Sequence, residues 1–467
     1  MANRNIILEQ FFLFGSFLTG LVLIFLVPPF QSPDENSHFF RAYQLSEGQW
    51  MGETMNGNRL GGSLPSSLSA MDASFKPLRY QYDEKVRMDD ILKEHTRKLN
   101  PETKVFTDFP NVAYYAPFPY LPQAIALFIG RHMQLSPIKL LYMGRLSGLI
   151  FWIWMVWLGL RYLPFWKRTY LLLALLPASL ALHASLSGDL VTNAVCFFLL
   201  GYFWYLINDK NAILKRSGLI LITSLVMVIA LNKFIYAPIL LLAFAIPKER
   251  FAVQGDKKWF PLALGLFTIL VVGVWSYALR SNFIPYDAYD PIFRDNVQLN
   301  PGVDPMAQLD FIKSNPCEFA SIVVKSYAES FQATIAHYFG KFGWEKNYLP
   351  AWILLLLILN TNLSAAQERI PPLVHRFRLA GWLFLISFIM MALFTTVIYL
   401  QWSPVGNPSI LSLSGRYFFA IFPFFFLIFS LVAPGKKWLQ KDIWFFIIPI
   451  LSWFALIMEV FYRYYSV

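Results

Sequence analysis

Charged residues are scarce in this chain. Asp, Glu, Lys and Arg make up only 14% of its 467 residues, while 57% are hydrophobic and the mean hydropathy is +0.48. Soluble globular domains carry roughly 25% charged residues, so the composition excludes an ordinary soluble fold. Several apolar runs are close to the roughly 20 residues that a helix needs to cross a membrane. The sequence therefore predicts an all-α, polytopic membrane protein that forms one integral domain over residues 1–467.

Cysteine is almost absent, and so are the common cofactor motifs. The two cysteines, Cys196 in an apolar run and Cys317 in a loop, provide neither a disulfide framework nor the paired spacing of a zinc site. The chain has no glycine-rich phosphate loop and no internal repeat. We therefore expect no metal and no cofactor.

The net charge of +11 suggests an anionic partner, either nucleic acid or anionic lipid. The basic residues lie mostly in short loops between apolar runs and form no concentrated basic domain. This placement indicates a membrane surface and argues against nucleic acid. The basic loops, which should all be cytoplasmic, contain Arg161/Lys167/Arg168, Lys210/Lys215/Arg216, Lys248/Arg250/Lys257/Lys258, Arg369/Arg376/Arg378 and Lys436/Lys437/Lys441.

About eleven apolar runs have the length and composition of membrane helices. The first has no small-residue cleavage site, so we interpret it as a retained helix that starts from a cytoplasmic N-terminus. The runs cover residues 7–27, 138–160, 169–186, 190–207, 218–231, 235–246, 259–279, 349–359, 379–400, 417–432 and 443–460.

A twelfth apolar run, residues 116–133, is ambiguous. Counting back from the basic loops places the turn before residue 138 outside, and counting forward from the N-terminus places residues 28–115 outside as well. Both hold only if 116–133 does not cross, and its three prolines suit an interfacial or re-entrant helix. The alternative is a short true span, with the count corrected elsewhere.

Two large external segments result from this map, residues 28–137 and residues 281–347. The first should carry amphipathic or interfacial helices, and both contain polar, Pro- or Asp-rich stretches suited to flexible or lid-like parts. We expect the chemistry to lie in these segments, on the extracytoplasmic face of the membrane.

Two carboxylates, Asp34 and Glu35, follow the first apolar run immediately. If a helix starts after Ser32, then Asp34, His38 and Arg41 share one of its faces. Ionisable groups beside a lipid boundary are costly unless they are used. We therefore predict Asp34 and Glu35 as catalytic residues and His38 and Arg41 as substrate-binding residues.

A structural alternative exists for this segment. Ser32 and Glu35 have the spacing of a capping box, and acids in a first helical turn favour the helix dipole. Capping accounts for Glu35 but leaves Asp34, His38 and Arg41 unexplained.

Asp189 and Lys233 fall at the outer ends of predicted spans. Asp189 is either part of a substrate site or a cap of the next helix. Lys233 is either a site residue or an interfacial lysine that extends to the membrane surface. We include both among the candidate substrate-binding residues.

Arg416 and Tyr417, in the stretch Ser414–Phe418, also lie on the outer side. Arg416 suits bidentate recognition of phosphate. Lys341 and Trp344 precede another span, where they either line a sugar or lipid-phosphate site or, for Trp344, anchor the membrane interface. We predict all four as substrate-binding residues.

Five stretches of the chain together resemble an uncharacterised family of bacterial membrane proteins that is similar to the GT-C superfamily of glycosyltransferases. Spread over most of the chain, these stretches are PPFQSPDENSHFFRAYQLSEG, NVAYYAPFPYLPQA, GRLSGL, LPASLALHASLSGD and WSPVGNPSILSLSGRYF. The resemblance implies many membrane helices, a large first external loop with amphipathic helices, and an acid at the start of that loop acting as a base. Asp34 matches this acid, and Asp189 occupies a second position that is often acidic.

The resemblance implies an inverting glycosyltransferase that moves a sugar from a polyprenyl-phosphate donor to an extracytoplasmic glycan or glycolipid acceptor in the cell envelope. In this reading Asp34 deprotonates the acceptor, while Arg416 and Lys233 stabilise the departing phosphate. A donor with one phosphate does not oblige a metal. The alternatives are a lipid or solute transporter, or a flippase-like component of polysaccharide assembly.

Overall fold

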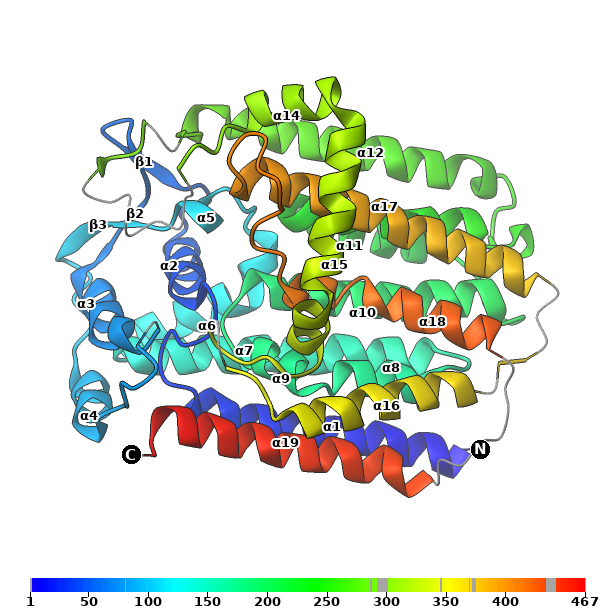
Figure 1. Cartoon of the computed structure of the whole chain (residues 1–467), viewed down its shortest axis with the longest axis horizontal. Coiled ribbons are helices and arrows are strands. Elements are labelled where there is room, and N and C mark those ends of the chain that lie inside the picture. Colours follow the sequence, from blue (N-terminus) through cyan, green and yellow to red (C-terminus); the bar gives the residue numbers. More distant parts are fainter. Residues whose placement is uncertain are drawn as a thin grey trace.

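The structure is a computed structural model that describes residues 2–79, 81–285, 288–291, 301–344, 347–368, 370–371, 375–433 and 442–466. The basic residues Arg369, Lys436, Lys437 and Lys441 lie outside this part of the chain. The described residues are mostly helical, and the long helices run side by side along one direction (Figure 1).

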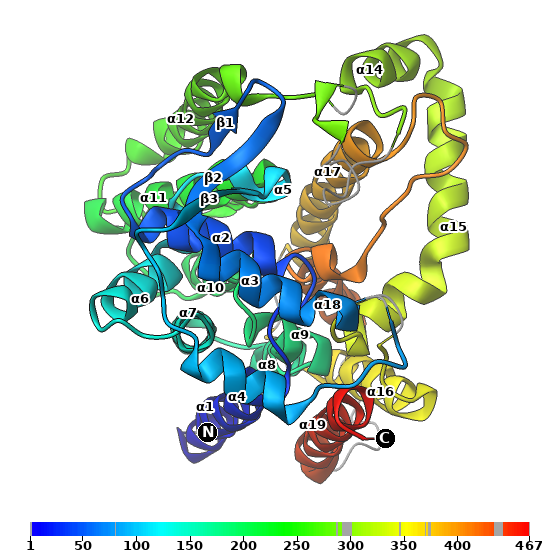
Figure 2. The same ribbon diagram turned by 90° about the vertical axis from the view of Figure 1, so that its left-hand side faces the viewer.

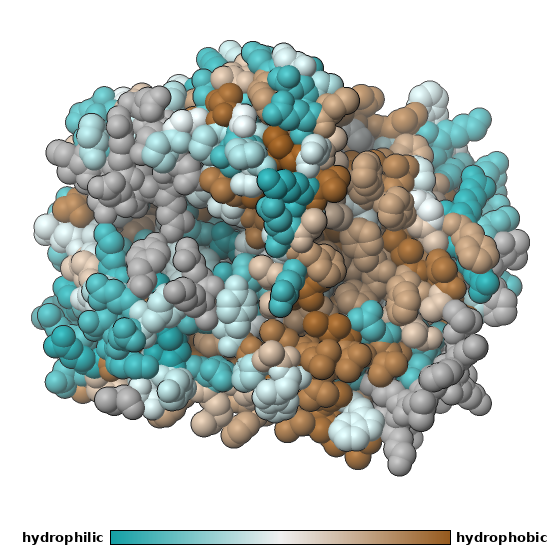
Figure 3. All heavy atoms as spheres, in the orientation of Figure 1, coloured by the Kyte–Doolittle hydropathy of each residue, from teal (hydrophilic) through white to brown (hydrophobic). Residues whose placement is uncertain are grey.

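Within the described residues, seven helical runs are long and apolar enough to cross a membrane. They are α1 (Ala2–Leu26), α7 (Pro137–Tyr162), α10 (Gly188–Asn208), the run Arg216–Ala245, α12 (Asp256–Ala278), α17 (Arg376–Trp402) and α19 (Asp442–Tyr464). Two shorter apolar helices, α16 (Ala351–Gln367) and α18 (Phe422–Val432), lie among them. Figure 3 shows a hydrophobic area over these helices, with hydrophilic residues gathered at both ends of the bundle. This pattern fits a multi-pass membrane protein.

The run Arg216–Ala245 turns back on itself. It consists of α11 (Arg216–Lys233) and the 3₁₀ segment η3 (Phe234–Ala245). The backbone of Lys233 has φ −136° and ψ 85°, which lies outside the helical region. Leu214, just before α11, donates its N–H to the carbonyl oxygen of Arg250, just after η3, at 2.6 Å. The two ends of the run therefore meet, and Lys233 lies at the turn.

The apolar run 169–186 is also interrupted. It forms α8 (Lys167–Ala174) and α9 (Pro177–His183). Pro177 has no N–H to donate and suits the first position of a helix, so it starts α9 and ends the continuity with α8. The side chains of α9 are buried within the bundle.

A domain built on residues 28–137 covers one end of the bundle. It contains a three-stranded antiparallel sheet in the order β1-β2-β3, with Gly61 to Pro65 opposite Asp108 to Lys104. The expected all-α class is therefore wrong for this segment. The elements are α2 (Glu35–Ser46), β1 (Glu53–Met55), β2 (Arg59–Pro65), α3 (Ser66–Phe75), η1 (Lys76–Arg79), α4 (Met88–Thr96), β3 (Lys104–Asp108), α5 (Pro110–Ala113), η2 (Phe118–Tyr120) and α6 (Leu121–His132).

The physical reason for this sheet lies in a glycine pair. A Cβ atom on Gly61 would lie within 1.9 Å of the carbonyl oxygen of Thr107, so only glycine allows β2 and β3 to approach this closely. Glycines weaken the alternation of polar and apolar residues that identifies a strand in a sequence. Strands this short therefore escape detection.

The ambiguous segment 116–133 forms η2 and α6 at the same end of the bundle. With 12 residues, α6 is about 18 Å long, which is too short to cross a hydrocarbon core of about 30 Å. Before its start, Tyr120 contacts His38, and near its end Arg131 donates to Ser46 Oγ at 3.3 Å. Both ends of α6 thus lie against α2.

The second large segment contributes a long helix that lies across the bundle. Figures 1 and 2 show α15 running nearly perpendicular to the long helices, from α14 to α16. Its residues Val324 and Phe331 are exposed. The remaining elements are η4 (Lys248–Arg250), η5 (Arg280–Asn282), α14 (Pro305–Ser314), α15 (Pro316–Gly340) and η7 (Gly415–Phe418).

Two glycines set the distance between α7 and α10. A Cβ atom on Gly201 would lie 2.4 Å from the carbonyl oxygen of Gly159. Small residues at such positions let two membrane helices pack backbone to backbone. This contact fixes α7, which carries Arg145, against α10, which carries Asp189.

We predict that Lys98 and His132 are accessible from one side of the membrane, and that Asn211 and Gln254 are accessible from the other. All four residues are exposed, and Lys98 precedes the ambiguous segment 116–133 while His132 lies at its C-terminal end. Single cysteines at these positions, in a C317S background that retains buried Cys196, would be treated with an impermeant maleimide in intact cells. Labelling of Lys98→Cys and His132→Cys from opposite sides would contradict the structure.

Candidate active site

A cleft of about 640 Å³ opens at the end of the bundle that carries residues 28–137. Its wall combines charged side chains, tryptophans and an apolar floor from α9, and it draws on segments from both ends of the sequence. The lining residues are Ser32, Pro33, Asp34, Ala178, Ala181, Leu182, His337, Lys341, Phe342, Gly343, Trp344, Trp402, Ser412, Leu413, Ser414, Arg416, Tyr417 and Phe419.

Asp34 and Arg416 form an ion pair in the wall of this cleft. The Nη2 atom of Arg416 donates to Asp34 Oδ2 at 2.6 Å, although the two residues are 382 positions apart in the chain. Asn111 Nδ2 lies 3.4 Å from the other carboxylate oxygen. The side chains of Asp34 and Arg416 are 14% and 23% exposed, so a ligand in the cleft can reach both.

The backbone of Asp34 differs from the sequence expectation. The helix α2 begins at Glu35, not at Pro33, and Asp34 precedes it in the left-handed conformation with φ 62°. The Asp34 carbonyl oxygen accepts the N–H of His38 at 3.0 Å. A non-glycine residue in this conformation is under strain that the surroundings must hold, which is common at functional sites.

Arg416 is placed by the glycine before it. A Cβ atom on Gly415 would lie 2.6 Å from the carbonyl oxygen of Thr334 and from the backbone nitrogen of Tyr338. The segment η7 can therefore press directly onto the backbone of α15. This contact fixes the position from which Arg416 reaches Asp34.

A second ion pair lies beside the first. The Nζ atom of Lys233 is 2.5 Å from Asp189 Oδ1, and the two side chains are 11% and 7% exposed. Ser187 Oγ, not Asp189, caps α10, because it accepts the N–H of Asp189 at 3.0 Å. The alternative interpretation of Asp189 as the cap of α10 is therefore wrong, and Lys233 is paired with Asp189.

Tyr417 joins the two ion pairs. The Lys233 Nζ atom lies 4.5 Å from the centre of the Tyr417 ring, within the range of a cation–π interaction. The Tyr417 hydroxyl oxygen accepts from Arg416 Nη2 at 3.0 Å. Asp34, Arg416, Tyr417, Lys233 and Asp189 thus form one connected cluster, with only part of it facing the cleft.

His38 lies behind this cluster in a buried position. Its Nδ1 atom is 2.6 Å from the Tyr120 hydroxyl and 3.4 Å from the Gly188 backbone nitrogen, which donates to it. Burial lowers the pKa of His38 to about 4, so the imidazole is neutral at neutral pH. A neutral ring whose Nδ1 accepts carries its proton on Nε2. His38 therefore accepts a hydrogen bond from the first residue of α10, Gly188, and does not supply a positive charge.

Lys341, Trp344 and His337 line the cleft from the end of α15 and the turn that follows it. The Trp344 indole donates to the carbonyl oxygen of Phe30 at 3.3 Å, and its side chain is mostly buried. Anchoring in a lipid-facing aromatic belt does not describe this environment. Sequence reasoning missed His337, because a single histidine in a mixed polar and apolar helix gives no signal.

Five of the predicted residues lie outside the cleft lining, namely Glu35, His38, Arg41, Asp189 and Lys233. Arg41 is buried and donates to Gln44 Oε1 and to the carbonyl oxygens of Trp50 and Tyr115. Glu35 is fully buried and forms an ion pair with Arg145 at 2.6 Å. The expected capping box does not form, because the Glu35 carboxylate accepts from the backbone N–H of Phe30 and not from that of Ser32.

Arg145 is a second residue that sequence reasoning missed. It lies in α7, where an ionisable side chain among apolar residues marks a functional or organising site. That signal was present in the stretch GRLSGL.

The electrostatics of the cleft favour an ionised Asp34. Burial alone would raise the pKa of Asp34, but the positive charge of Arg416 and its hydrogen bond outweigh burial and hold that pKa below the ordinary value of 3.8. The Arg416 Nε atom is buried and has no hydrogen-bond partner among the described residues. The cleft therefore presents the Asp34 carboxylate beside the Arg416 guanidinium, whose Nε–H can still donate a hydrogen bond.

Among the described residues, no group of three or more His, Cys, Asp or Glu side chains could hold a metal ion.

We predict that R416Q lowers the unfolding temperature most at neutral pH and less in acid. Because the pKa of Asp34 is lowered in the fold, the ion pair stabilises the protein above the ordinary carboxyl pKa, and this contribution is lost as pH falls through the lowered value. A charge-assisted hydrogen bond of this kind contributes roughly 1.5–3 kcal/mol. Thermal unfolding in detergent from about pH 3 to pH 8 measures the difference.

R416K is the matched control, because it keeps a positive charge at the same position. It should retain the pH dependence of the wild type. A destabilisation by R416Q that is constant over the whole pH range would contradict the assignment of the Asp34–Arg416 pair.

A family model described as "Predicted membrane protein (DUF2142)" matches residues 17–425. No curated protein and no solved structure matches the chain. The matched region contains both ion pairs of the site, Asp34–Arg416 and Asp189–Lys233. Because the match covers most of the 467 residues, the protein belongs to the family of predicted membrane proteins described as DUF2142.

Proposed function

We propose that this protein is an inverting glycosyltransferase of the GT-C type, which moves a sugar from a polyprenyl-phosphate donor to a glycan or glycolipid acceptor. The observation that carries the proposal is the Asp34–Arg416 pair in the wall of a cleft with both polar and apolar surfaces. A base, a phosphate-binding cation and an apolar surface are the three groups that such a transfer needs. The resemblance of the sequence to GT-C enzymes supports the same reaction class.

In the proposed reaction, the acceptor hydroxyl oxygen attacks the anomeric carbon of the donor. The new carbon–oxygen bond forms as the bond between the anomeric carbon and the phosphate oxygen breaks, and the electron pair leaves with the polyprenyl phosphate. The acceptor proton passes to Asp34. One displacement at the anomeric carbon inverts its configuration, and the reaction requires no resident cofactor.

The donor phosphate would compete with Asp34 for Arg416. When Arg416 turns its free Nε donor and one Nη donor to the phosphate, Asp34 loses its strongest positive neighbour and its pKa rises. A carboxylate with a higher pKa is a better base. Donor binding would thus activate Asp34 at the moment when an acceptor can use it.

The charges in the cleft suit a donor with one phosphate. Arg416 and Lys341 both line the cleft, whereas Lys233, which contacts Asp189 and Tyr417, does not. We therefore assign Arg416 and Lys341 as the direct phosphate contacts, and Lys233 as a residue that orients Tyr417. The apolar side chains of Ala178, Ala181 and Leu182 provide a surface for the lipid next to these cations.

The proposed topology has eleven crossings, with the cleft on the extracytoplasmic face and the N-terminus in the cytoplasm of a bacterial cell. This count adds α8–α9, α16 and α18 to the seven long runs and treats α11 and η3 as two crossings. All the predicted basic loops within the described residues connect elements at the end opposite to residues 28–137 (Figure 1). Basic loops lie on the cytoplasmic side of a membrane protein, so this placement supports a cytoplasmic position for the end opposite to residues 28–137.

We predict that D34N abolishes transfer, with kcat lowered by about 10²–10⁴-fold, because the amide cannot accept the acceptor proton. Purified protein in vesicles would be given radiolabelled polyprenyl-phosphate sugars one at a time, together with glycolipid acceptors from a cell envelope. Product formation would be followed by thin-layer chromatography.

The control is D108N, which alters a mostly buried carboxylate in the same domain but outside the cleft. It should transfer sugar at a rate close to that of the wild type. Normal transfer by D34N would refute the role of Asp34 as base. Movement of a labelled lipid or sugar across the bilayer without transfer would favour the transporter alternative.

A further inference from the structure

A buried arginine, Arg145, donates hydrogen bonds to several chain segments near the cleft. Arg145, in α7, is 1% exposed and donates to the carbonyl oxygens of Ile24, Val27 and Pro28 at 2.7, 2.7 and 3.1 Å. These carbonyls lie at and just after the end of α1, where a helix leaves its last carbonyl groups without partners. Arg145 therefore satisfies the end of the first membrane helix from a neighbouring helix.

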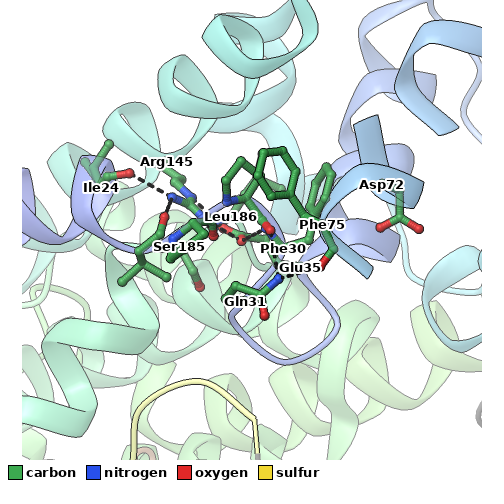
Figure 4. A network of polar contacts seen from close by, with 12 residues as sticks. Ile24, Phe30, Gln31, Glu35, Asp72, Phe75, Arg145, Ser185 and Leu186 are labelled. Carbon is green, nitrogen blue, oxygen red and sulfur yellow. Dashed lines mark hydrogen bonds and ion pairs between the residues drawn. The ribbon is translucent and has the colours of Figure 1, made fainter. Parts of the chain in front are cut away.

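The same guanidinium holds Glu35 in a two-pronged ion pair. Arg145 Nε and Nη2 donate to Glu35 Oε1 and Oε2 at 2.7 and 2.6 Å (Figure 4). The Glu35 carboxylate also accepts the backbone N–H of Phe30 at 3.1 Å and that of Leu186 at 2.9 Å. One buried carboxylate thus binds the loop after α1, the turn before α10 and the helix α7.

These bonds lie next to both acids of the candidate site. Glu35 directly follows Asp34, and Leu186 lies three positions before Asp189. Glu35 and Arg145 do not line the cleft. They are fully or almost fully buried, so they can act on the cleft only through the backbone segments that they hold.

The loop that Glu35 holds is one with unusual backbone conformations. Phe30 and Asp34 both have positive φ, 64° and 62°. Such residues persist only where the surrounding contacts fix them. The hydrogen bond from the Phe30 N–H to the Glu35 carboxylate joins the start of this loop to the residue that follows Asp34.

We propose that Glu35 and Arg145 are a positioning pair, which sets the places of Asp34 and Asp189 relative to Arg416 and Lys233. This inference deepens the proposed function and rests on it for its catalytic consequence. Glu35 is thereby assigned to the support of the base and not to proton transfer. Removing its charge displaces Asp34 while leaving the chemical groups of the cleft intact.

The test uses E35Q, which keeps the shape of Glu35, in full-length protein in vesicles. We expect kcat to fall by about 10²-fold, because a displacement of about 1 Å at a reacting group has an effect of that size. We also expect the acidic limb of the pH–rate profile to move up by about one pH unit, since Asp34 moves away from Arg416. A loss of folded protein alone would reduce the rate without moving this limb.

A double variant, E35Q/R145M, separates positioning from stability. Replacing both members of a buried ion pair avoids leaving an unpaired charge, so the double variant should unfold at a higher temperature than R145M alone, which leaves the Glu35 charge buried and unpaired. Both of these variants lose the Arg145 donors to the carbonyl oxygens of Ile24, Val27 and Pro28. We expect its transfer rate to remain as low as that of E35Q. Recovery of both stability and transfer would overturn the proposal and leave the pair with a purely structural role.

The matched control is E94Q, because Glu94 is also fully buried and pairs with an arginine in the same domain, Arg97. It should leave the rate and the pH profile unchanged. An equal loss in E94Q would overturn the proposal, because any buried acid of the domain would then suffice.

Hydrogen exchange gives a readout that needs no substrate. In E35Q, peptides that contain Phe30 and Leu186 should exchange faster than in the wild type, because their N–H groups lose a charged acceptor, whereas peptides from α10 and α17 should not change. If wild-type protein transfers no sugar but this pattern appears, the proposed function fails and the structural half of the inference stands. Unchanged exchange in E35Q would overturn the inference whatever the enzyme assay gives.

Discussion

The bond network around Arg145 is the constraint on which the rest of this structure depends. A membrane helix must end where its last carbonyl groups can find donors, and α1 ends where Arg145 provides them. The same guanidinium forms an ion pair with Glu35. The Glu35 carboxylate also accepts the backbone N–H of Phe30, in the loop after α1, and that of Leu186, in the turn before α10. The loop that carries Asp34 and the turn before Asp189 are thus held by the contacts that terminate α1.

Much of the candidate site could be predicted from the sequence, because charge placement is informative in a membrane. Asp34, Asp189, Lys233 and Arg416 drew attention as ionisable residues at the outer ends of apolar runs, and the structure brings all four into one cluster. The pairing of Asp34 with Arg416 was not predictable, since partners 382 positions apart leave no local pattern. The capping alternative for Glu35 is wrong for the same reason: the capping spacing is local, while its partner Arg145 is distant.

The fold was predictable in outline and not in its details. Hydropathy identified the long helices and the break at Lys233 between the runs 218–231 and 235–246, but the sheet next to Gly61 depends on single backbone positions. A hydropathy pattern averages over such positions. The same limit applies to α15, whose mixture of exposed apolar and charged residues reveals neither a crossing nor a direction.

The distance along the chain between Asp34 and Arg416 has a consequence for biosynthesis. At about 5–20 residues per second, a ribosome needs roughly 20–75 s to make the 382 residues that separate them. During that interval the first helix and its loop are already made, but Asp34 has no guanidinium beside it. A chain that stops early, or that inserts its later helices wrongly, therefore cannot assemble the cleft. The Asp34–Arg416 pair can form only after the chain has been made as far as Arg416, with α18 and α19 still to follow.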